Sequence, residues 1–292
     1  MLTNSRNRLI HLHSLHVLTR RFLRKVIKYD PSLINIYSIT PKKMTEIYGI
    51  PPQTAISLYK KLHHPIALSR LELHKNNYSI ITLVDEAYPP MLKTIQDAPL
   101  VLYAKGNLEL LQEVKVISVI GTRNPTTEAY EKTQFIVKPL VMENWTIVSG
   151  MALGIDSFAH QHTLIENGKT IAVLGSGFKH IYPRRNISLF KKIVKSGLVI
   201  TEYPPDVAPK PYHFPERNRI ISGLSLGTVV IEATEKSGTL ITVDQALDQG
   251  REVYALPGSP LVAQTKGCHK IIQEGAKLVM DIDDILEDWQ LV

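Results

Sequence analysis

The sequence predicts an α/β protein, with an open, mostly parallel sheet that has helices on both faces and a small helical domain in front of it. Short β-branched runs recur along the chain, and each ends at a glycine or a polar turn. Stretches of helical length separate these runs, which is the spacing of βα units. Residues 1–72 instead contain short helix-like segments. We therefore expect a helical domain at 1–72 and a sheet domain at 73–292.

The helical domain is expected to contain a helical hairpin. The segments 41–50 and 53–62 have the outline of a helix-hairpin-helix, with Gly49 in the turn. Such a turn can offer backbone N–H groups to a DNA phosphate, but Pro51 and Pro52 remove two of those donors. The domain is therefore either a DNA-binding module or a helical packing domain.

Positive charge is concentrated near the N-terminus. Residues 1–75 hold 13 Lys and Arg against 3 Asp and Glu, a balance of +10, whereas the remainder holds 21 against 24, a balance of −3. This segregation suggests a polyanionic partner. His11, His13 and His16 have no carboxylate or Cys nearby to complete a metal site, so we expect them on a helix surface.

The sheet domain begins with two strand-like runs, 80–84 and 100–104, which we expect at an edge of the sheet. Parallel strands are expected within 116–123, 146–150, 170–177, 198–203, 228–233 and 252–258. A covering helix is expected at 126–143. Parallel sheets bind ligands beyond the carboxyl ends of their strands, and Gly121, Gly150 and Gly175 expose bare backbone there. The ligand is therefore expected to carry phosphate.

The segment 169–219 combines cations with aromatic side chains. It holds 10 Lys and Arg against 3 Asp and Glu. The aromatic residues between them are Tyr182, Phe190, Tyr203, Tyr212 and Phe214, and the cations include Lys179, Arg184, Arg185 and Lys210. Charge holds a nucleic-acid backbone while unstacked bases stack on aromatic rings. The pattern is typical of single-stranded nucleic-acid binding.

Two further turns are expected to face the same ligand. Pro215 is suited to begin a helix, which would put Arg217, Asn218 and Arg219 in its first turn. Cations there oppose the helix dipole, so they indicate a bound anion. Ser237 and Gly238 lie in another small-residue turn that opens a helix.

Asp156 and His160 are four residues apart on one helix face. The pair is interpreted as a local hydrogen-bonded contact that positions the preceding glycine-rich turn, with general acid–base chemistry as the alternative. The single Cys268 excludes a disulfide framework and a zinc cluster. With no apolar run of membrane-spanning length and no signal peptide, we expect a cytoplasmic protein without a membrane contact, metal or cofactor.

Six motifs in order resemble the DNA-processing protein A family (DprA, also called Smf): IGTRNP, VSGMALGID, FPERNRIISGLS, SGTLIT, GREVYALPGS and GCHKIIQEGA. The resemblance runs from about residue 88 to residue 279. It implies an extended Rossmann-like domain, with the N-terminal helices similar to a SAM-like domain. Because the sequence ends soon after the sheet domain, we expect no counterpart of the winged-helix domain that some members carry at the C-terminus.

The resemblance implies a single-stranded DNA binding protein of natural transformation that dimerises, protects incoming strands and loads the recombinase RecA, without catalysis or cofactor. The DNA pocket maps by resemblance to Arg123, Ser149, Gly150, Arg184, Phe214 and Asn218. With the neighbouring small and basic residues, the predicted DNA site also includes Gly121, Thr122, Lys179, Arg185, Lys210, Arg217, Ser237 and Gly238. The surface for the second copy and for RecA is expected at His269, Ile272 and Gln273.

The alternatives are a nucleotide-binding sensor and a phosphoribohydrolase-like enzyme of a related superfamily. Gly238 and Thr239 resemble the core of the phosphoribohydrolase turn, whose catalytic Glu stands three residues after the Thr. That position is Thr242 here, so the acid is missing. A dehydrogenase is disfavoured because the turn at Gly121 lacks G-x-G-x-x-G spacing. A serine hydrolase is disfavoured because neither Ser149 nor Ser176 lies in G-x-S-x-G.

Overall fold

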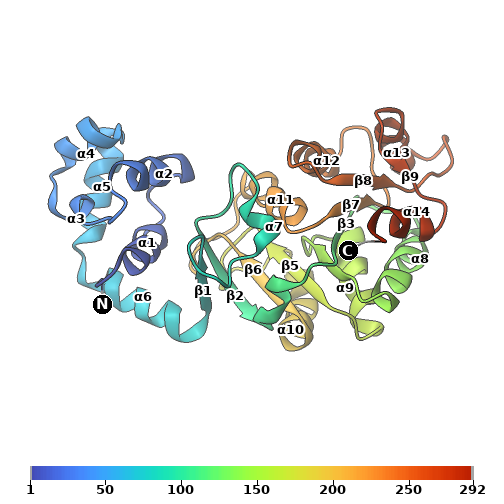
Figure 1. Cartoon of the computed structure of the whole chain (residues 1–292), viewed down its shortest axis with the longest axis horizontal. Coiled ribbons are helices and arrows are strands. Elements are labelled where there is room, and N and C mark those ends of the chain that lie inside the picture. Colours follow the sequence, from blue (N-terminus) through green and yellow to red (C-terminus); the bar gives the residue numbers. More distant parts are fainter. Residues whose placement is uncertain (1, 291–292) are drawn as a thin grey trace. The chain divides into compact units, whose positions relative to one another are not determined.

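The computed structural model describes residues 2–290, and the chain divides into two compact units (Figure 1). The first unit contains the residues up to Glu86 together with Pro99–Tyr103. The second contains Ala87–Ala98 and the chain from Ala104 onward. The second unit carries the parallel strands whose ends were expected to form the site.

The first unit is mainly helical. Its helices are α1 (Ser5–Ser14), α2 (Arg20–Tyr29), α3 (Asn35–Ser38), α4 (Pro41–Tyr48), α5 (Pro52–Leu62) and α6 (Pro65–Asn77). The side chains of Asn4, Thr19 and Thr40 accept hydrogen bonds from the first turns of α1, α2 and α4, so polar caps define where these helices begin. Leu23, Met44 and Leu58 bring α2, α4 and α5 into one buried core.

The predicted hairpin is formed by α4 and α5. Gly49 ends α4 with φ 65°, a left-handed conformation that favours glycine, and its N–H donates to the carbonyl of Thr45. Ile50 is fully buried behind the turn, and Pro52 begins α5. The short turn therefore reverses the chain between two helices that share one core.

The expectation that the N-terminal histidines lie on the surface is wrong for His11. Its side chain is fully buried, with Nδ1 2.9 Å from the hydroxyl of Tyr37. Burial lowers the pKa of His11 to about 4, so it is neutral at physiological pH. His13 is half-buried and packs against the ring of Tyr103, whereas His16 is exposed.

The sheet has nine strands in the order β1-β2-β6-β5-β4-β3-β7-β8-β9. The strands are β1 (Ser79–Thr82), β2 (Val101–Gly106), β3 (Val116–Ile120), β4 (Thr146–Ser149), β5 (Thr170–Leu174), β6 (Leu198–Thr201), β7 (Gly227–Val230), β8 (Glu252–Ala255) and β9 (Lys277–Leu278). All neighbouring strands from β6 to β9 pair in parallel. Consequently the carboxyl ends of β3, β4, β5 and β7 lie at one edge.

Helices cover both faces of this sheet. In the second unit they are α7 (Pro90–Lys93), α8 (Ala129–Met142), α9 (Ile155–Ile165), α10 (Ile187–Ser196), α11 (His213–Gly223), α12 (Gly238–Asp248), α13 (Ala263–Gln273) and α14 (Asp283–Leu286). Figure 1 shows α8, α9 and α10 below the sheet and α11 and α12 above it. A mostly parallel sheet covered on both faces confirms the predicted fold class.

The main core of this unit lies between the sheet and helices α8 and α9. Ile117 of β3 and Ile147 of β4 are fully buried there, as are Ile136 and Leu140 of α8. The short strands are buried along their whole length, which explains why they appear in the sequence as continuous apolar runs without alternation. The six parallel strands expected from such runs are confirmed, and β1 and β2 lie at the predicted edge.

Helix α11 begins earlier than the sequence predicted. It starts at His213 instead of Pro215, so Arg217 and Arg219 lie beyond its first turn. Arg219 is buried, and its guanidinium contacts Glu202 at 2.7 Å and Asp97 at 3.3 Å. The expectation that Arg219 indicates a bound anion is therefore wrong, because carboxylates of the same chain neutralise it.

Within residues 2–290, no helix combines the length and the apolar character needed to cross a bilayer. Over the same residues, no group of three His, Cys, Asp or Glu side chains is placed to hold a metal ion.

Candidate nucleic-acid interface

A pocket of about 280 Å³ lies where strands β3 and β7 end. The predicted site residues that line it are Gly121, Thr122, Arg123, Phe214, Arg217, Asn218, Ser237 and Gly238. They come from three separate parts of the chain, namely the turn after β3, helix α11 and the start of α12. We call this cavity the strand-end pocket.

Arg123, Phe214 and Tyr182 form a row beside the pocket. The guanidinium carbon of Arg123 lies 5.7 Å from the centre of the Phe214 ring. The centre of the Phe214 ring is also 5.4 Å from the centre of the Tyr182 ring, which is 50% exposed. A cation and two flat rings are thus adjacent and open to solvent, which suits stacking of an unpaired base beside a phosphate contact.

The ring of Phe214 is held in place by Gly175 at the end of β5. A Cβ atom on Gly175 would lie 2.9 Å from Cδ1 of Phe214, closer than carbon atoms approach in folded proteins. Next to it, the imidazole of His213 lies 3.2 Å from the carbonyl oxygen of Gly175. The glycine expected to face a phosphate therefore serves a different purpose, because it admits the aromatic ring that borders the pocket.

Arg217 lies at the floor of the pocket. Its side chain is buried, Nη1 donates to the carbonyl of Val173 at 2.6 Å, and the guanidinium covers the backbone of Gly150. Any Cβ on Gly150 would overlap Nη1. Burial lowers the pKa of Arg217 to about 10, so it remains a cation at neutral pH. Arg217 and Gly150 thus shape the site from beneath, in place of the exposed contacts that the sequence predicted.

Asp156 caps the turn that follows β4. Its Oδ2 accepts hydrogen bonds from the N–H groups of Gly150 at 3.2 Å and Ala152 at 3.3 Å, as expected for a side chain that positions this turn. Burial raises its pKa, while the charge of Arg217 opposes that shift. The expected pair with His160 is wrong, because the His160 ring lies 2.7 Å from Thr170 Oγ1 instead. Burial lowers the pKa of His160 to about 3, so it is a poor general base.

The first turn of α12 forms the opposite wall. Ser237 is the N-cap, and its hydroxyl accepts from the N–H of Thr239 at 2.9 Å. Gly238 is exposed, with no heavy atom near the position that a Cβ would occupy. Thr242, where a phosphoribohydrolase would carry its catalytic acid, lines the same wall and is buried.

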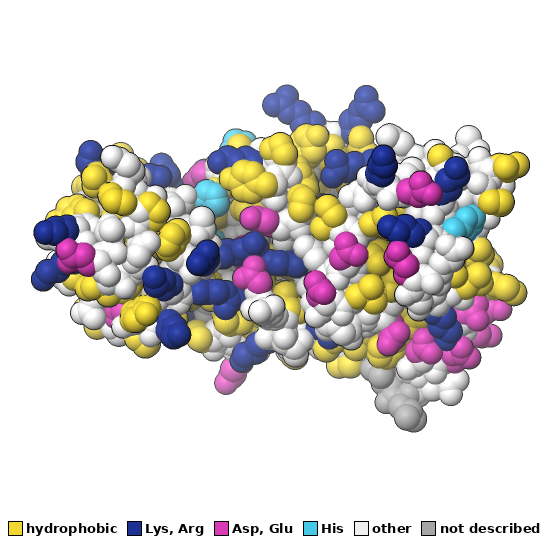
Figure 2. All heavy atoms as spheres, turned by 90° about the horizontal axis from the view of Figure 1, so that it is seen from above, with side chains coloured by type: hydrophobic (Ala, Val, Ile, Leu, Met, Phe, Trp, Pro, Cys, Tyr) yellow, Lys and Arg dark blue, Asp and Glu magenta, His cyan; other side chains and the backbone are white. Residues whose placement is uncertain are grey.

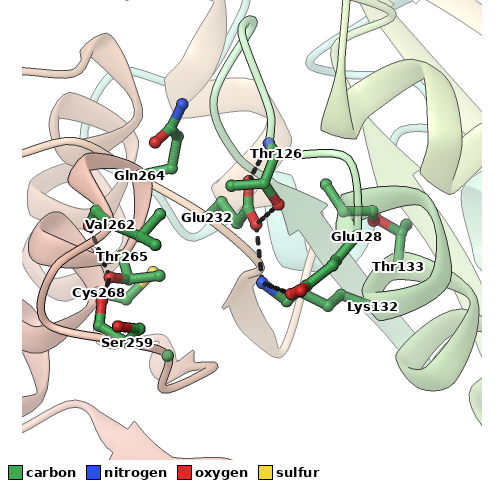
Figure 3. Close-up of polar contacts among 12 residues, drawn as sticks. Thr126, Glu128, Lys132, Thr133, Glu232, Ser259, Val262, Gln264, Thr265 and Cys268 are labelled. Atoms are coloured by element: carbon green, nitrogen blue, oxygen red, sulfur yellow. Dashed lines mark hydrogen bonds and ion pairs between the residues drawn. The ribbon is translucent and has the colours of Figure 1, made fainter.

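The loop that carries Arg123 is anchored by Glu232, a residue that the sequence reasoning did not select. Its fully buried carboxylate accepts from the Thr126 N–H at 2.9 Å, from the Thr126 hydroxyl at 2.5 Å and from Lys132 at 3.0 Å (Figure 3). The Glu232 carbonyl also accepts from the Thr122 N–H at 2.7 Å. Both ends of the short loop are therefore fixed around Arg123. An acid directly after a buried strand was the available sequence signal.

Ser149 and Lys179 do not present free polar groups to the pocket. Ser149 is fully buried, and its hydroxyl donates to the carbonyl of Val119 between β4 and β3. Lys179 lies 2.5 Å from Asp206, so a carboxylate already balances its charge. These two residues stabilise the chain around the site.

Arg184, Arg185 and Lys210 lie outside the pocket lining and are exposed. Both arginines belong to the short helix η2 (Arg184–Asn186). Asn186 holds η2 against the turn after β4, because its side-chain amide donates to Met151 O and Ser157 Oγ, each at 2.8 Å. The arginines therefore extend from a segment fixed next to a pocket wall. Lys210 stands over the ring of Tyr212, at 5.7 Å from the ring centre.

Helix α13 carries the predicted partner surface. Ile272 and His269 are half-buried and Gln273 is exposed, with the His269 ring 3.0 Å from the carbonyl of Gly258. At the other end of α13, the Gln264 amide donates to the carbonyl of Asn124 at 3.4 Å. The same helix that carries Ile272 therefore contacts the loop of Arg123.

Comparison with known proteins assigns the family. The model of the family described as DNA recombination-mediator protein A matches residues 79–290. The chain belongs to this family. Its sequence is 43% identical to DNA processing protein DprA of Bacillus subtilis over 230 residues, which are 79% of this chain and 76% of that protein. It is 41% identical to the Streptococcus pneumoniae protein of the same name, over 80% of this chain and 82% of that one.

Solved structures of the family agree with this assignment. The X-ray structure of DNA processing protein A from Streptococcus pneumoniae has a TM-score of 0.83 and 37% identity, and the match covers 95% of each chain. A structure of the Helicobacter pylori protein, solved for its single-stranded DNA binding mode, has a TM-score of 0.66 and 28% identity. That match covers 73% of this chain and 95% of the other. The resemblance inferred from the motifs is thereby confirmed.

The contact between Gly150 and Arg217 leads to a stability prediction. Gly150→Ala should lower the free energy of unfolding by about 1–3 kcal/mol, because the added methyl displaces a buried guanidinium. Gly238→Ala is the matched control and should be neutral or slightly stabilising, since its Cβ meets open space at the start of a helix. Urea denaturation of both variants measures the difference, and equal midpoints would contradict the packing role of Gly150.

Proposed function

We propose that this chain binds single-stranded DNA at the strand-end pocket and the adjoining row of Arg123, Phe214 and Tyr182. We propose further that it acts in natural transformation, in the cytoplasm, where it protects incoming strands and loads RecA recombinase onto them. On this proposal it works by binding alone, without enzymatic turnover or a cofactor.

The observation that carries the proposal is the arrangement of Arg123, Phe214 and Tyr182. The centres of the half-exposed Phe214 ring and the exposed Tyr182 ring are 5.4 Å apart, and the guanidinium carbon of Arg123 lies 5.7 Å from the centre of the Phe214 ring. Bases in a duplex are already stacked on their neighbours, so rings of this kind favour unpaired bases. Arg184 and Arg185 nearby supply charge for the backbone of a strand that continues past the pocket.

The relatives support the same ligand. The Helicobacter pylori protein, which matches 73% of this chain, is described by its single-stranded DNA binding mode. The pocket residues Arg123, Phe214 and Asn218 lie within the family match. We infer from these relatives that the ligand of the present chain is also single-stranded DNA.

The alternative functions fit the pocket less well. Its volume of about 280 Å³ is near the lower end of the roughly 300–1,000 Å³ usual for small-molecule sites, so the exposed rings and cations beside the pocket, and not its volume, favour a strand over a single nucleotide. Thr242 in place of a catalytic acid disfavours a phosphoribohydrolase. The dependence of affinity on ligand length separates these functions. A nucleotide sensor would bind a mononucleotide as tightly as a strand of about 20 bases, whereas a single-strand binding protein would bind the longer strand more tightly because it contacts more phosphates.

Helix α13 is the surface that we propose for self-association and for RecA. Ile272 offers an apolar centre between His269 and Gln273, and such a patch on one helix suits a two-fold contact with a second copy. Because α13 also contacts the Arg123 loop through Gln264, pairing of two chains would bring two DNA sites into one assembly.

The pocket proposal predicts a change in salt dependence. Arg123→Ala and Arg184→Ala should each weaken single-strand binding and reduce the slope of log K against log salt by about 0.7, because each removes one phosphate contact. Fluorescence anisotropy at several salt concentrations measures the slope. Lys138→Ala, at a surface pair with Glu166, is the control and should leave it unchanged. Unaltered slopes for both arginine variants would contradict the proposal.

Stacking predicts a different signature at Phe214. Phe214→Ala should cost about 1–3 kcal/mol of single-strand binding while leaving the salt slope unchanged, because a ring contacts a base and no counterion is released. Phe135→Ala, at an exposed ring of α8, is the control and should retain affinity. If Phe214→Ala binds as tightly as the unaltered chain, the ring serves packing alone.

A negative charge introduced on α13 tests whether two copies of the chain associate through this helix. Ile272→Glu should give monomers in multi-angle light scattering, because a carboxylate would be buried at the contact between copies. Ile165→Glu places the same charge at an isoleucine that is 61% exposed on α9, and it should leave the mass unchanged. A dimer mass for Ile272→Glu would refute the proposed surface.

A further inference from the structure

Helix α2 of the first unit carries a stripe of cations on one face. Arg21, Lys25 and Lys28 are spaced i, i+4 and i+7, which places them along one side of the helix. Leu23 and Val26 on the other side are buried in the unit's core. We call these three cations the α2 stripe.

The N-terminal part of the stripe works against the stability of its helix. Arg21 and Lys25 are like charges four residues apart, and Arg21 in the first turn opposes the helix dipole, whereas Lys28 in the last turn is favourable. Among the described helices of this unit longer than four residues, namely α1, α2, α4, α5 and α6, none has an acidic residue in its first turn. By contrast α8, α9 and α11 of the second unit each have one. The first unit therefore retains a strong positive field.

The few carboxylates of residues 1–75 are engaged elsewhere. Asp30 is buried and accepts hydrogen bonds from Ser32 Oγ at 2.8 Å and from the Ile36 N–H at 3.2 Å. Glu46 lies 4.0 Å from Lys42, and Glu72 lies 3.3 Å from Lys75. The face drawn in Figure 2 shows Lys and Arg side chains spread over this unit with little acidic surface between them.

The stripe lies beside the α4–α5 turn. A Cβ atom on Gly49 would lie only 2.8 Å from Nζ of Lys25, so the ammonium group sits against the backbone of the turn. Lys25, the middle cation of the stripe, thus lies against Gly49, where the backbone of the turn is left-handed. Of the two rings on α2, Phe22 is half-buried and Tyr29, after Lys28, is 59% exposed. The row therefore offers charge along its length and a single exposed ring at its end, which suits successive phosphates better than a series of unpaired bases.

We propose that the α2 stripe and the adjoining Gly49 turn form a second nucleic-acid site, which binds the phosphate backbone of double-stranded DNA without contacts to its bases. The duplex presents phosphates at high, regular density, which matches a straight row of charges on a helix. The site is separate from the strand-end pocket, and its existence does not depend on the ligand proposed for that pocket.

The test uses the full chain with Arg123→Ala and Phe214→Ala, so that the strand-end pocket contributes little to binding. In this background Arg21→Gln, Lys25→Gln and Lys28→Gln together should reduce the salt slope for a labelled duplex of about 30 base pairs by about 3. Duplex affinity at about 50 mM salt should fall on the order of tenfold or more. Fluorescence anisotropy at several salt concentrations measures both.

Two further variants keep the result interpretable. Arg21→Lys, Lys25→Arg and Lys28→Arg preserve charge and should preserve duplex binding. Lys138→Gln, Lys169→Gln and Lys277→Gln remove the same charge from ion pairs in the second unit and should leave the slope unchanged. Equal slopes for the stripe variant and its background, or equal losses in both glutamine variants, would overturn the proposal. So would retention of the stripe protein on phosphatidylserine vesicles without duplex binding.

Discussion

The guanidinium of Arg217 lies buried against the backbone of Gly150, and the candidate site depends on that contact. A buried cation costs several kcal/mol unless polar groups surround it, and here the Val173 carbonyl accepts its hydrogen bond while the charge of Asp156 stabilises it. Arg217 thereby fixes α11 over the ends of β4 and β5. Phe214, one turn earlier on the same helix, can then reach the space left open by Gly175.

A second buried charge, the carboxylate of Glu232, fixes the loop on the other side of the pocket. Glu232 accepts three hydrogen bonds from Thr126 and Lys132, and its carbonyl holds Thr122. The exposed Arg123 therefore projects from a loop whose two ends are fixed. In both cases the group proposed to meet the ligand, half-buried Phe214 or exposed Arg123, is reached by solvent, while its orientation comes from a buried ion. Such preorganisation lowers the entropic cost of binding.

The two units divide positive charge in different ways. In the second unit Arg219, Lys132 and Lys179 are neutralised by carboxylates of the same chain, which leaves a few cations such as Arg123 and Arg184 exposed beside aromatic rings. In the first unit the α2 stripe is a row of cations with a single exposed ring, that of Tyr29, at its end. Charge combined with rings distinguishes unpaired from paired bases, whereas charge alone responds to phosphate density.

The sequence by itself determined where the parallel strands lie along the chain, because continuous apolar runs and the glycines after them are local signals. The likeness of its motifs to a known family grouped Arg123, Phe214 and Asn218, and the structure brings these three residues to one pocket. Only the tertiary structure decided what each group faces. Gly150 and Gly175 look alike in sequence, yet they admit a guanidinium and a ring from α11. His11 and Arg219 are polar residues buried by partners far away along the chain. Burial and charge pairing arise from contacts between distant segments, so no local pattern records them.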